Sequence, residues 1–452
     1  MKVGSAWRNA TAGGLLLACG VVRAQEPAPV APWSLTGAVT RALATHPSLE
    51  SARAGEIEAQ SATGETRAAW WPSVRLSVTA TQYEEPTLVL PLHSLSILSR
   101  PVFDHRIMQG NAVATFTVFD GGARQARTGQ ARALERSAGA GLNMTQQALV
   151  ARCIAAFVEV RTQQEILGAQ NARLGALAAE QQRVQRRLAA GRAAQVELLR
   201  VEAGVARAAA ERVSTQQALA VARSELARLT GSTPEEVPAE PLEPVALADT
   251  TLPARDAVLR AASEHNADLL RAAAAAQGAE AAAQLARSAR WPELRAQGTY
   301  SAWSNIGGDQ AAEWNAGLQL YYPLFTGGAT RRAIERADAA RRGAVAEQRV
   351  AALQIAQDID RALARVAETH ALARSLAVAV DRSAEVVRIE RLSLDAGSGT
   401  QTDYLRAEAE LLDARAGLVQ ARHGEITARS ELARVSGALD LDWIARNLEA
   451  RP

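Results

Sequence analysis

The stretch "ARSELAR" occurs twice in this chain, at residues 222–228 and again at 428–434. Self-similarity at a fixed spacing marks a repeated structural unit. Further matches continue upstream at offsets of 206 to 220 residues: "VFDGGA" (118–123) with "LFTGGA" (324–329), Ala190-Gly191 with Ala396-Gly397, and Trp71-Pro72 with Trp291-Pro292. The chain is therefore predicted to contain two copies of one structural plan.

This duplication divides the chain into segments. A proline-rich connector, which contains "GSTPEEVPAEPLEP", separates the two copies. The predicted segments are a signal peptide (1–24), a first repeat (25–230), the connector (231–253), a second repeat (254–438) and a C-terminal tail (439–452).

The first 24 residues have the layout of a secretory signal. Lys2 and Arg8 precede a stretch of small residues and leucine, and Ala24 ends a suitable cleavage site. A competing interpretation is a lipoprotein box, because Leu16-Leu17-Ala18-Cys19 would make Cys19 the acylated residue. We expect simple cleavage and no lipidation.

Composition and proline placement indicate long helices. Aromatic residues make up only 4% of the chain, and no proline lies between Pro101 and Pro234 or between Pro323 and Pro452. A helix over residues 123–189 would be about 100 Å long at about 1.5 Å per residue, which exceeds a compact domain. We predict a mainly α fold with a small β part.

Charge and side-chain chemistry argue against several classes of function. Removing residues 1–24 takes away Lys2, Arg8 and Arg23 and no acid, so the net charge falls from +2 to −1. Such a surface offers no electrostatic basis for binding nucleic acid. The six histidines are scattered, and the chain has neither a phosphate-binding glycine loop nor a nucleophile elbow. We therefore expect no enzyme activity, cofactor or metal.

Four short segments alternate apolar and polar residues and carry aromatic residues near their ends. This pattern is typical of outer-membrane strands, although one small soluble hairpin per repeat is an alternative. Four strands cannot close a barrel in lipid, so several chains would have to share one barrel, and three chains would give twelve strands. The predicted strands cover 74–84, 112–119, 294–303 and 314–325.

The order of these motifs resembles the TolC family of outer-membrane export ducts. The series runs from "SLTGAVTRALATHPSLESA" through Trp-Pro, two strands, Phe-Asp-Gly-Gly, a long helix, an Ala-Gly turn and a returning helix, and then repeats over about 34–438. The resemblance implies a homotrimer with a twelve-stranded β-barrel in outer-membrane lipid and an α-helical barrel through the periplasm. It also implies two partners, a periplasmic adaptor and an inner-membrane ABC or proton-driven transporter.

Within the family, "FDGG" resembles members that serve type I protein secretion and some drug pumps, and the "LFGR"-like sequence of the lipid-anchored efflux members is absent. We expect export of a protein toxin, and the outer component for an adenylate cyclase toxin is one candidate. The alternatives are drug or metal efflux and a periplasmic coiled-coil adaptor, which the strands disfavour. The apolar segment 86–101 is interpreted as a loop over the outer mouth.

The resemblance also implies site residues at the periplasmic tip. Gly191 and Gly397 match the turn glycine where the adaptor docks. Glu197 and Asp403 match acids that line the aperture, where like charges about 4 Å apart cost about 4 kcal/mol per pair. The alternative role for both acids is compensation of helix N-terminal charge. Arg406 replaces a further carboxylate found in family members, and an ion pair with Asp403 would weaken cation selectivity.

Four arginines gather around the end of the first predicted long helix. They are Arg183, Arg186, Arg187 and Arg192. We expect a solvated face that offsets the helix dipole, with contact to the adaptor as the alternative.

Overall fold

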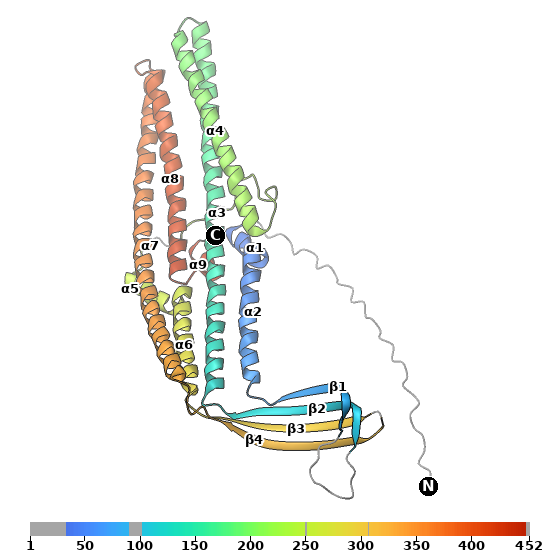
Figure 1. The fold of residues 1–452 in the computed structure, drawn as a ribbon. Coiled ribbons are helices and arrows are strands. Elements are labelled where there is room, and N and C mark those ends of the chain that lie inside the picture. The colour runs from blue at the N-terminus through green and yellow to red at the C-terminus, as the bar shows by residue number, and fades with distance from the viewer. Residues whose placement is uncertain (1–32, 90–101, 249–250, 306, 449–452) are drawn as a thin grey trace. The chain divides into compact units, whose positions relative to one another are not determined.

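The computed structural model describes residues 33–89, 102–248, 251–305 and 307–448. Within them the order helix, helix, strand, strand, helix, helix occurs twice, and a short helix follows the second copy (Figure 1). The predicted signal peptide, with Cys19, and most of the apolar segment 86–101 lie outside the described residues.

The helices of the first copy are α1 (Leu35–Thr45), α2 (Pro47–Ala68), α3 (Ala123–Ala189) and α4 (Gln195–Thr230). Local chemistry sets several of their ends. At the start of α1, the amide of Gly37 donates a hydrogen bond of 3.0 Å to the Ser34 hydroxyl. Pro47 takes the first position of α2, where no amide hydrogen is needed.

The helices of the second copy are α5 (Arg255–His265), α6 (Ala267–Ser288), α7 (Ala329–Asp395) and α8 (Gln401–Val435). The additional helix α9 (Leu441–Asn447) lies in the predicted tail. Helix α7 has 67 residues, as has α3, and neither contains proline. Each is about 100 Å long at about 1.5 Å per residue.

The four strands form one antiparallel sheet in the order β1-β2-β3-β4. They are β1 (Ser73–Leu88), β2 (Phe103–Phe119), β3 (Glu293–Asn305) and β4 (Gln310–Tyr321). Four bounds differ from the prediction by four residues or more: the end of β1, the start of β2 and both ends of β4. Strand β2 begins before residue 112 because residues 106–111 pair with residues 77–82 of β1, and Asp104 and Phe103 pair with the end of β1 beyond a register shift. Strand β4 ends before residue 325, next to Pro323, which has no amide hydrogen to donate.

One face of the sheet is apolar and exposed. On β1, Val74 and Leu76 are 73% and 74% exposed, and on β4 Leu318 is 71% exposed. The other face is polar. There the side chains of Gln109 and Ser301 donate hydrogen bonds of 3.0 and 2.8 Å to Asn111.

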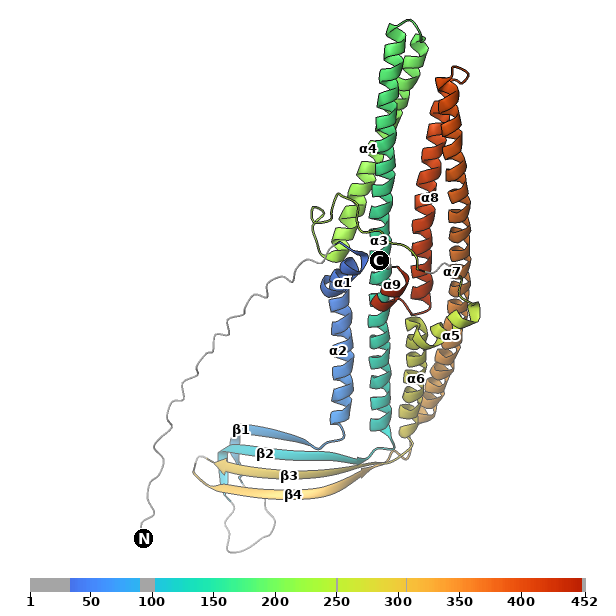
Figure 2. The same cartoon turned by 180° about the vertical axis from the view of Figure 1, so that it is seen from behind.

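Helix α3 is central to the helical part. It packs against α2, α4, α6 and α8, whereas α7 packs against α6 and α8. Both views place α7 at one edge of the helices, and α2 with the end of α4 that lies near α1 at the opposite edge (Figures 1 and 2). The largest buried cluster joins α1, α3 and α4 to the connector and α9, and includes Leu149, Phe157 and Leu226. No helix in the described part of the chain is long and apolar enough to cross a membrane.

Candidate functional site

Two glycines make the turns between paired long helices. Gly191 follows α3 with a φ of 68°, and Gly397 follows α7 with a φ of 80°. In the first turn, the amide of Arg192 donates a hydrogen bond of 2.8 Å to the carbonyl of Arg187. A Cβ at either glycine would meet no atom within 4 Å. Backbone conformation, rather than packing within the chain, therefore favours glycine at both positions.

Glu197 lies in the first turn of α4. Its carboxylate accepts a hydrogen bond of 3.3 Å from the amide of Ala194, the residue that precedes the helix. The guanidinium of Arg187, at the end of α3, lies 4.0 Å from the other carboxylate oxygen. Within one chain, Glu197 thus stabilises the start of α4 and the turn next to it.

Asp403 has the equivalent place in α8. Its amide donates a hydrogen bond of 3.2 Å to the Thr400 hydroxyl, and that hydroxyl donates one of 2.6 Å to the Asp403 carboxylate. Arg406 is exposed and, in the residues that the structure describes, makes neither an ion pair nor a hydrogen bond. The ion pair considered between Arg406 and Asp403 is therefore not formed, because the Asp403 carboxylate is held by Thr400.

Of the four arginines around the end of α3, Arg186 and Arg192 are exposed, whereas Arg183 departs from the expected solvated face. Its guanidinium makes two hydrogen bonds of 2.9 and 3.0 Å to Glu180 and one of 2.5 Å to Asp395, at the end of α7. A second link joins Arg200 on α4 to Thr402 on α8, at 2.8 Å. The two helical hairpins are thus tied together close to both turns.

Buried polar side chains lie beside these links. The Tyr404 hydroxyl donates a hydrogen bond of 3.0 Å to Glu408, and burial raises the pKa of Tyr404 to about 12. Gln401 is buried, and among the described residues its amide nitrogen and oxygen have no hydrogen-bond partner. Such groups weaken the packing near the turn, because each loses hydration without a replacement bond.

A second polar cluster joins α3, α7 and α8 near the connector. The Thr162 hydroxyl lies 2.6 Å from His423 Nδ1, and His370 Nδ1 lies 3.0 Å from Glu425. Arg429 donates two hydrogen bonds to the same Glu425 oxygen, at 3.1 and 3.0 Å. Burial is the main cause that lowers the pKa of His423. This cluster ties the two repeats together, and local sequence patterns did not reveal it.

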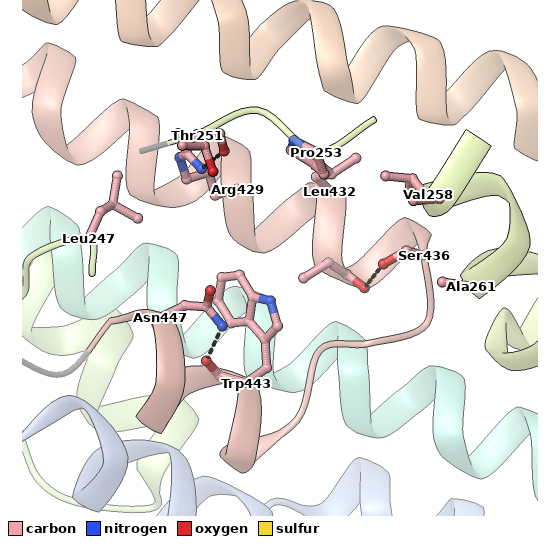
Figure 3. A pocket seen from close by; sticks show the side chains of 12 residues that line it. Leu247, Thr251, Pro253, Val258, Ala261, Arg429, Leu432, Ser436, Trp443 and Asn447 are labelled. Carbon is pink, nitrogen blue, oxygen red and sulfur yellow. Dashed lines mark hydrogen bonds between the residues drawn. The ribbon is translucent and has the colours of Figure 1, made fainter. Parts of the chain in front are cut away.

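A cavity of about 380 Å³ lies between the end of the connector and helices α5, α8 and α9 (Figure 3). Leu247, Val258 and Leu432 contribute apolar side chains to its wall. Its polar groups are engaged locally: the Asn447 amide donates to the carbonyl of Trp443 at 2.8 Å, and the Ser436 hydroxyl to that of Ala433 at 2.9 Å. Because these polar groups already bond to nearby backbone carbonyls, the evident role of the residues that line the cavity is packing.

The described residues include no group of three or more His, Cys, Asp or Glu side chains placed to hold a metal ion. The one described cysteine, Cys153, is buried, and burial raises its pKa to about 12. A thiol of that kind is unreactive near neutral pH.

Comparisons with known proteins agree with this architecture. A family model described as "Outer membrane efflux protein" matches residues 38–232 and 258–438. The outer membrane protein TolC of Vibrio cholerae serotype O1 is 23% identical over 302 residues, which cover 65% of this chain and 69% of that protein.

Two solved structures illustrate the shared fold. The outer membrane protein VceC from Vibrio cholerae has a TM-score of 0.73 at 20% identity, over 89% of this chain and 96% of that chain. The MtrE outer membrane channel of Neisseria gonorrhoeae, in its open state, has a TM-score of 0.74 at 19% identity, over 90% and 89%. The predicted fold, mainly helical and similar to TolC with four strands, is confirmed.

Proposed function

Because this chain belongs to the outer membrane efflux protein family, we propose that it is the exit duct of a protein secretion machine, built from three copies. Members of this family are outer-membrane channels of tripartite export systems. They extend into the periplasm and are not enzymes. The proposal adds the trimer, a periplasmic adaptor at the turns and an inner-membrane ABC transporter.

The sheet carries the proposal. Its apolar face is exposed across the strands, and within the described residues β1 and β4 each pair along one edge only. Free amide and carbonyl groups cannot remain unpaired in lipid. Pairing β4 of one copy with β1 of the next removes both free edges, and three copies give a closed sheet of twelve strands.

The helical edges support the same assembly. Exposed apolar side chains follow α7, and others follow α2 and α4 at the opposite edge. They include Val350, Leu353, Val378, Ile389 and Leu392 on α7, and Ile57, Val213 and Val221 on α2 and the later part of α4. Two different surfaces at opposite edges form a head-to-tail interface, which closes into a ring under rotational symmetry.

Unheated electrophoresis and planar-bilayer recording of the detergent-purified protein test the duct. We expect a heat-dissociable trimer that produces steady conductance steps. A water-soluble monomer without conductance would contradict the proposal and would favour the periplasmic scaffold.

The substrate class rests on the junctions between strand and helix. "FDGG" (119–122) resembles the junction of the type I secretion members and of some drug pumps, and an adenylate cyclase toxin is one candidate cargo. Efflux of drugs or metals is the alternative, since the family description itself is efflux.

Complementation separates these substrates. A strain that lacks its own outer-membrane duct receives this chain together with either an ABC exporter and its toxin or a proton-driven drug pump. We expect toxin in the medium in the first case. Restored drug resistance without toxin export would contradict protein secretion and would indicate that the chain serves drug efflux.

A further inference from the structure

The two repeats match in strand register as well as in sequence. In β1 and β2, Ser73 pairs with Thr115, and in β3 and β4, Glu293 pairs with Tyr321. Adding 220 to the residue number on β1 and 206 to the residue number on β2 converts the pair Ser73–Thr115 into the pair Glu293–Tyr321. The sequence repeats have the same two offsets. For any contact within the first repeat, these offsets therefore identify the equivalent residues of the second.

Glycines at the strand-to-helix junctions match in backbone conformation. Gly121 and Gly122 have φ angles of 62° and 89°, and Gly327 and Gly328 have 60° and 85°. Their surroundings differ. A Cβ at Gly121 would lie 2.5 Å from Trp291 Cβ and 2.9 Å from the carbonyl oxygen of Ser288. A Cβ at Gly122, Gly327 or Gly328 would meet nothing within 4 Å.

The turn that covers Gly121 also has a counterpart. The amide of Trp291 donates to the carbonyl of Ser288 at 3.0 Å, and the amide of Trp71 donates to that of Ala68 at the same distance. Inside the chain the turn of the second repeat sits on the glycine of the first. The turn of the first repeat, which precedes β1, and Gly327, which follows β4, both lack the equivalent contact among the described residues of the chain. Strands β1 and β4 are the two edges of the sheet.

We propose that Gly327 of one copy packs against the Ala68–Trp71 turn of the next copy, and that β4 pairs with the neighbouring β1 in the register of β2 with β3. This deepens the proposed function, because it rests on the ring of copies and specifies how neighbours meet. In β2 and β3, Val113 pairs with Thr299. The same offsets place Gln319 opposite Thr79 of the neighbouring copy.

Alanine substitutions at the paired glycines test the packing. Strain alone makes Gly328→Ala the worse change, because a φ of 60° lies near the left-handed minimum of about 57° and one of 85° does not. The proposal gives the opposite order, since a Cβ at Gly327 would strike the neighbouring turn. We expect Gly327→Ala to lower the dissociation temperature of the oligomer by at least about twice the shift of Gly328→Ala. Equal shifts, or the reverse order, overturn the contact.

Cysteine cross-linking tests the register independently. Gln319→Cys combined with Thr79→Cys is compared with Gln319→Cys plus Ser77→Cys and Gln319→Cys plus Thr81→Cys, which lie two positions away on the same polar face. The chain without introduced cysteines serves as the background. We expect covalent dimers and trimers in the unreduced gel mainly for the Thr79 pair. Stronger cross-linking at Ser77 or Thr81 overturns the register.

The two failures are distinguishable. An intact, conducting oligomer that cross-links in another register would contradict this inference but not the proposed exit duct. If the unaltered chain forms no oligomer, the proposed exit duct itself is contradicted.

Discussion

Gly231 and Gly437 end α4 and α8 at equivalent positions, with φ angles of 67° and 77°. Different neighbours surround them. A Cβ at Gly231 would meet the Thr45 hydroxyl at 2.9 Å, whereas one at Gly437 would overlap the backbone carbonyl of His265. A threonine hydroxyl can rotate away, but a backbone carbonyl between two helices cannot move without moving both.

We therefore expect Gly437→Ala to lower the free energy of unfolding by about 3 kcal/mol, from backbone strain plus overpacking. Gly397→Ala, which adds strain alone, is the control and costs about 1 kcal/mol. Gly231→Ala should fall between them. Chemical unfolding in detergent measures all three, and an equal loss for Gly437→Ala and Gly397→Ala would show that the His265 contact is irrelevant.

Asp403 combines two possible roles, helix capping and charge at the aperture. Thr400→Ala removes the cap at a cost of about 1 kcal/mol and leaves the charge. Asp403→Asn removes the charge. If Asp403 lines the aperture, Asp403→Asn lowers the cation-to-anion permeability ratio in bilayer recordings and Thr400→Ala does not. Unchanged selectivity in Asp403→Asn would leave capping as the role of this carboxylate.

At the scale of elements, the starts of α3 and α7 show how one plan tolerates different chemistry. The Asp120 carboxylate accepts hydrogen bonds from the amides of Gly122 and Arg124 at 3.2 and 2.8 Å, and Arg124 also lies over the Trp70 ring. Thr326, the counterpart of Asp120, accepts one longer bond of 3.5 Å from the amide of Thr330, and its hydroxyl lies 3.2 Å from the Thr330 hydroxyl. The start of α3 is therefore held more firmly than that of α7.

Asp120→Ala should cost about 2 kcal/mol of stability, because it removes the cap and leaves the nearly buried Arg124 without its carboxylate. Thr326→Ala is the matched control, and we expect a loss below about 1 kcal/mol. Thermal unfolding of both variants supplies the comparison. A larger loss in Thr326→Ala would contradict this account of the two junctions.

At the scale of the whole molecule, His423 joins the repeats, because its ring on α8 contacts Thr162 on α3. The neighbouring charges are Glu165, Arg161 and Glu159 on α3 and Arg422 on α8. The pKa of His423 lies below its usual value, mainly through burial. The unfolded chain therefore binds the proton more readily, and stability is lost as pH falls through the ordinary histidine pKa of about 6.5.

We expect the unaltered chain to lose stability between neutral pH and about pH 5, and His423→Gln to reduce that dependence. His265→Gln is the control, because His265 is exposed. Unfolding midpoints measured across this range decide the matter. An unchanged pH profile in His423→Gln would remove His423 as the cause.

The sequence by itself determined the fold class and the four strands. Repeats, proline-free tracts and strict alternation are local signals, and they act through backbone geometry and the burial of one face. Gly191 and Gly397 could be located as turn residues because each interrupts a long proline-free tract of strong helix formers, and the structure gives each a left-handed φ.

Only the tertiary structure decided the partners of the polar side chains. Arg183 meets Asp395 across 212 positions of sequence, and Thr162 meets His423 across 261. No local pattern encodes such pairs, because they depend on how two helical hairpins approach each other. Asp403 bonds to Thr400 rather than Arg406 for a related reason: helix-end geometry, which residue spacing alone does not resolve, directs its carboxylate back to the cap.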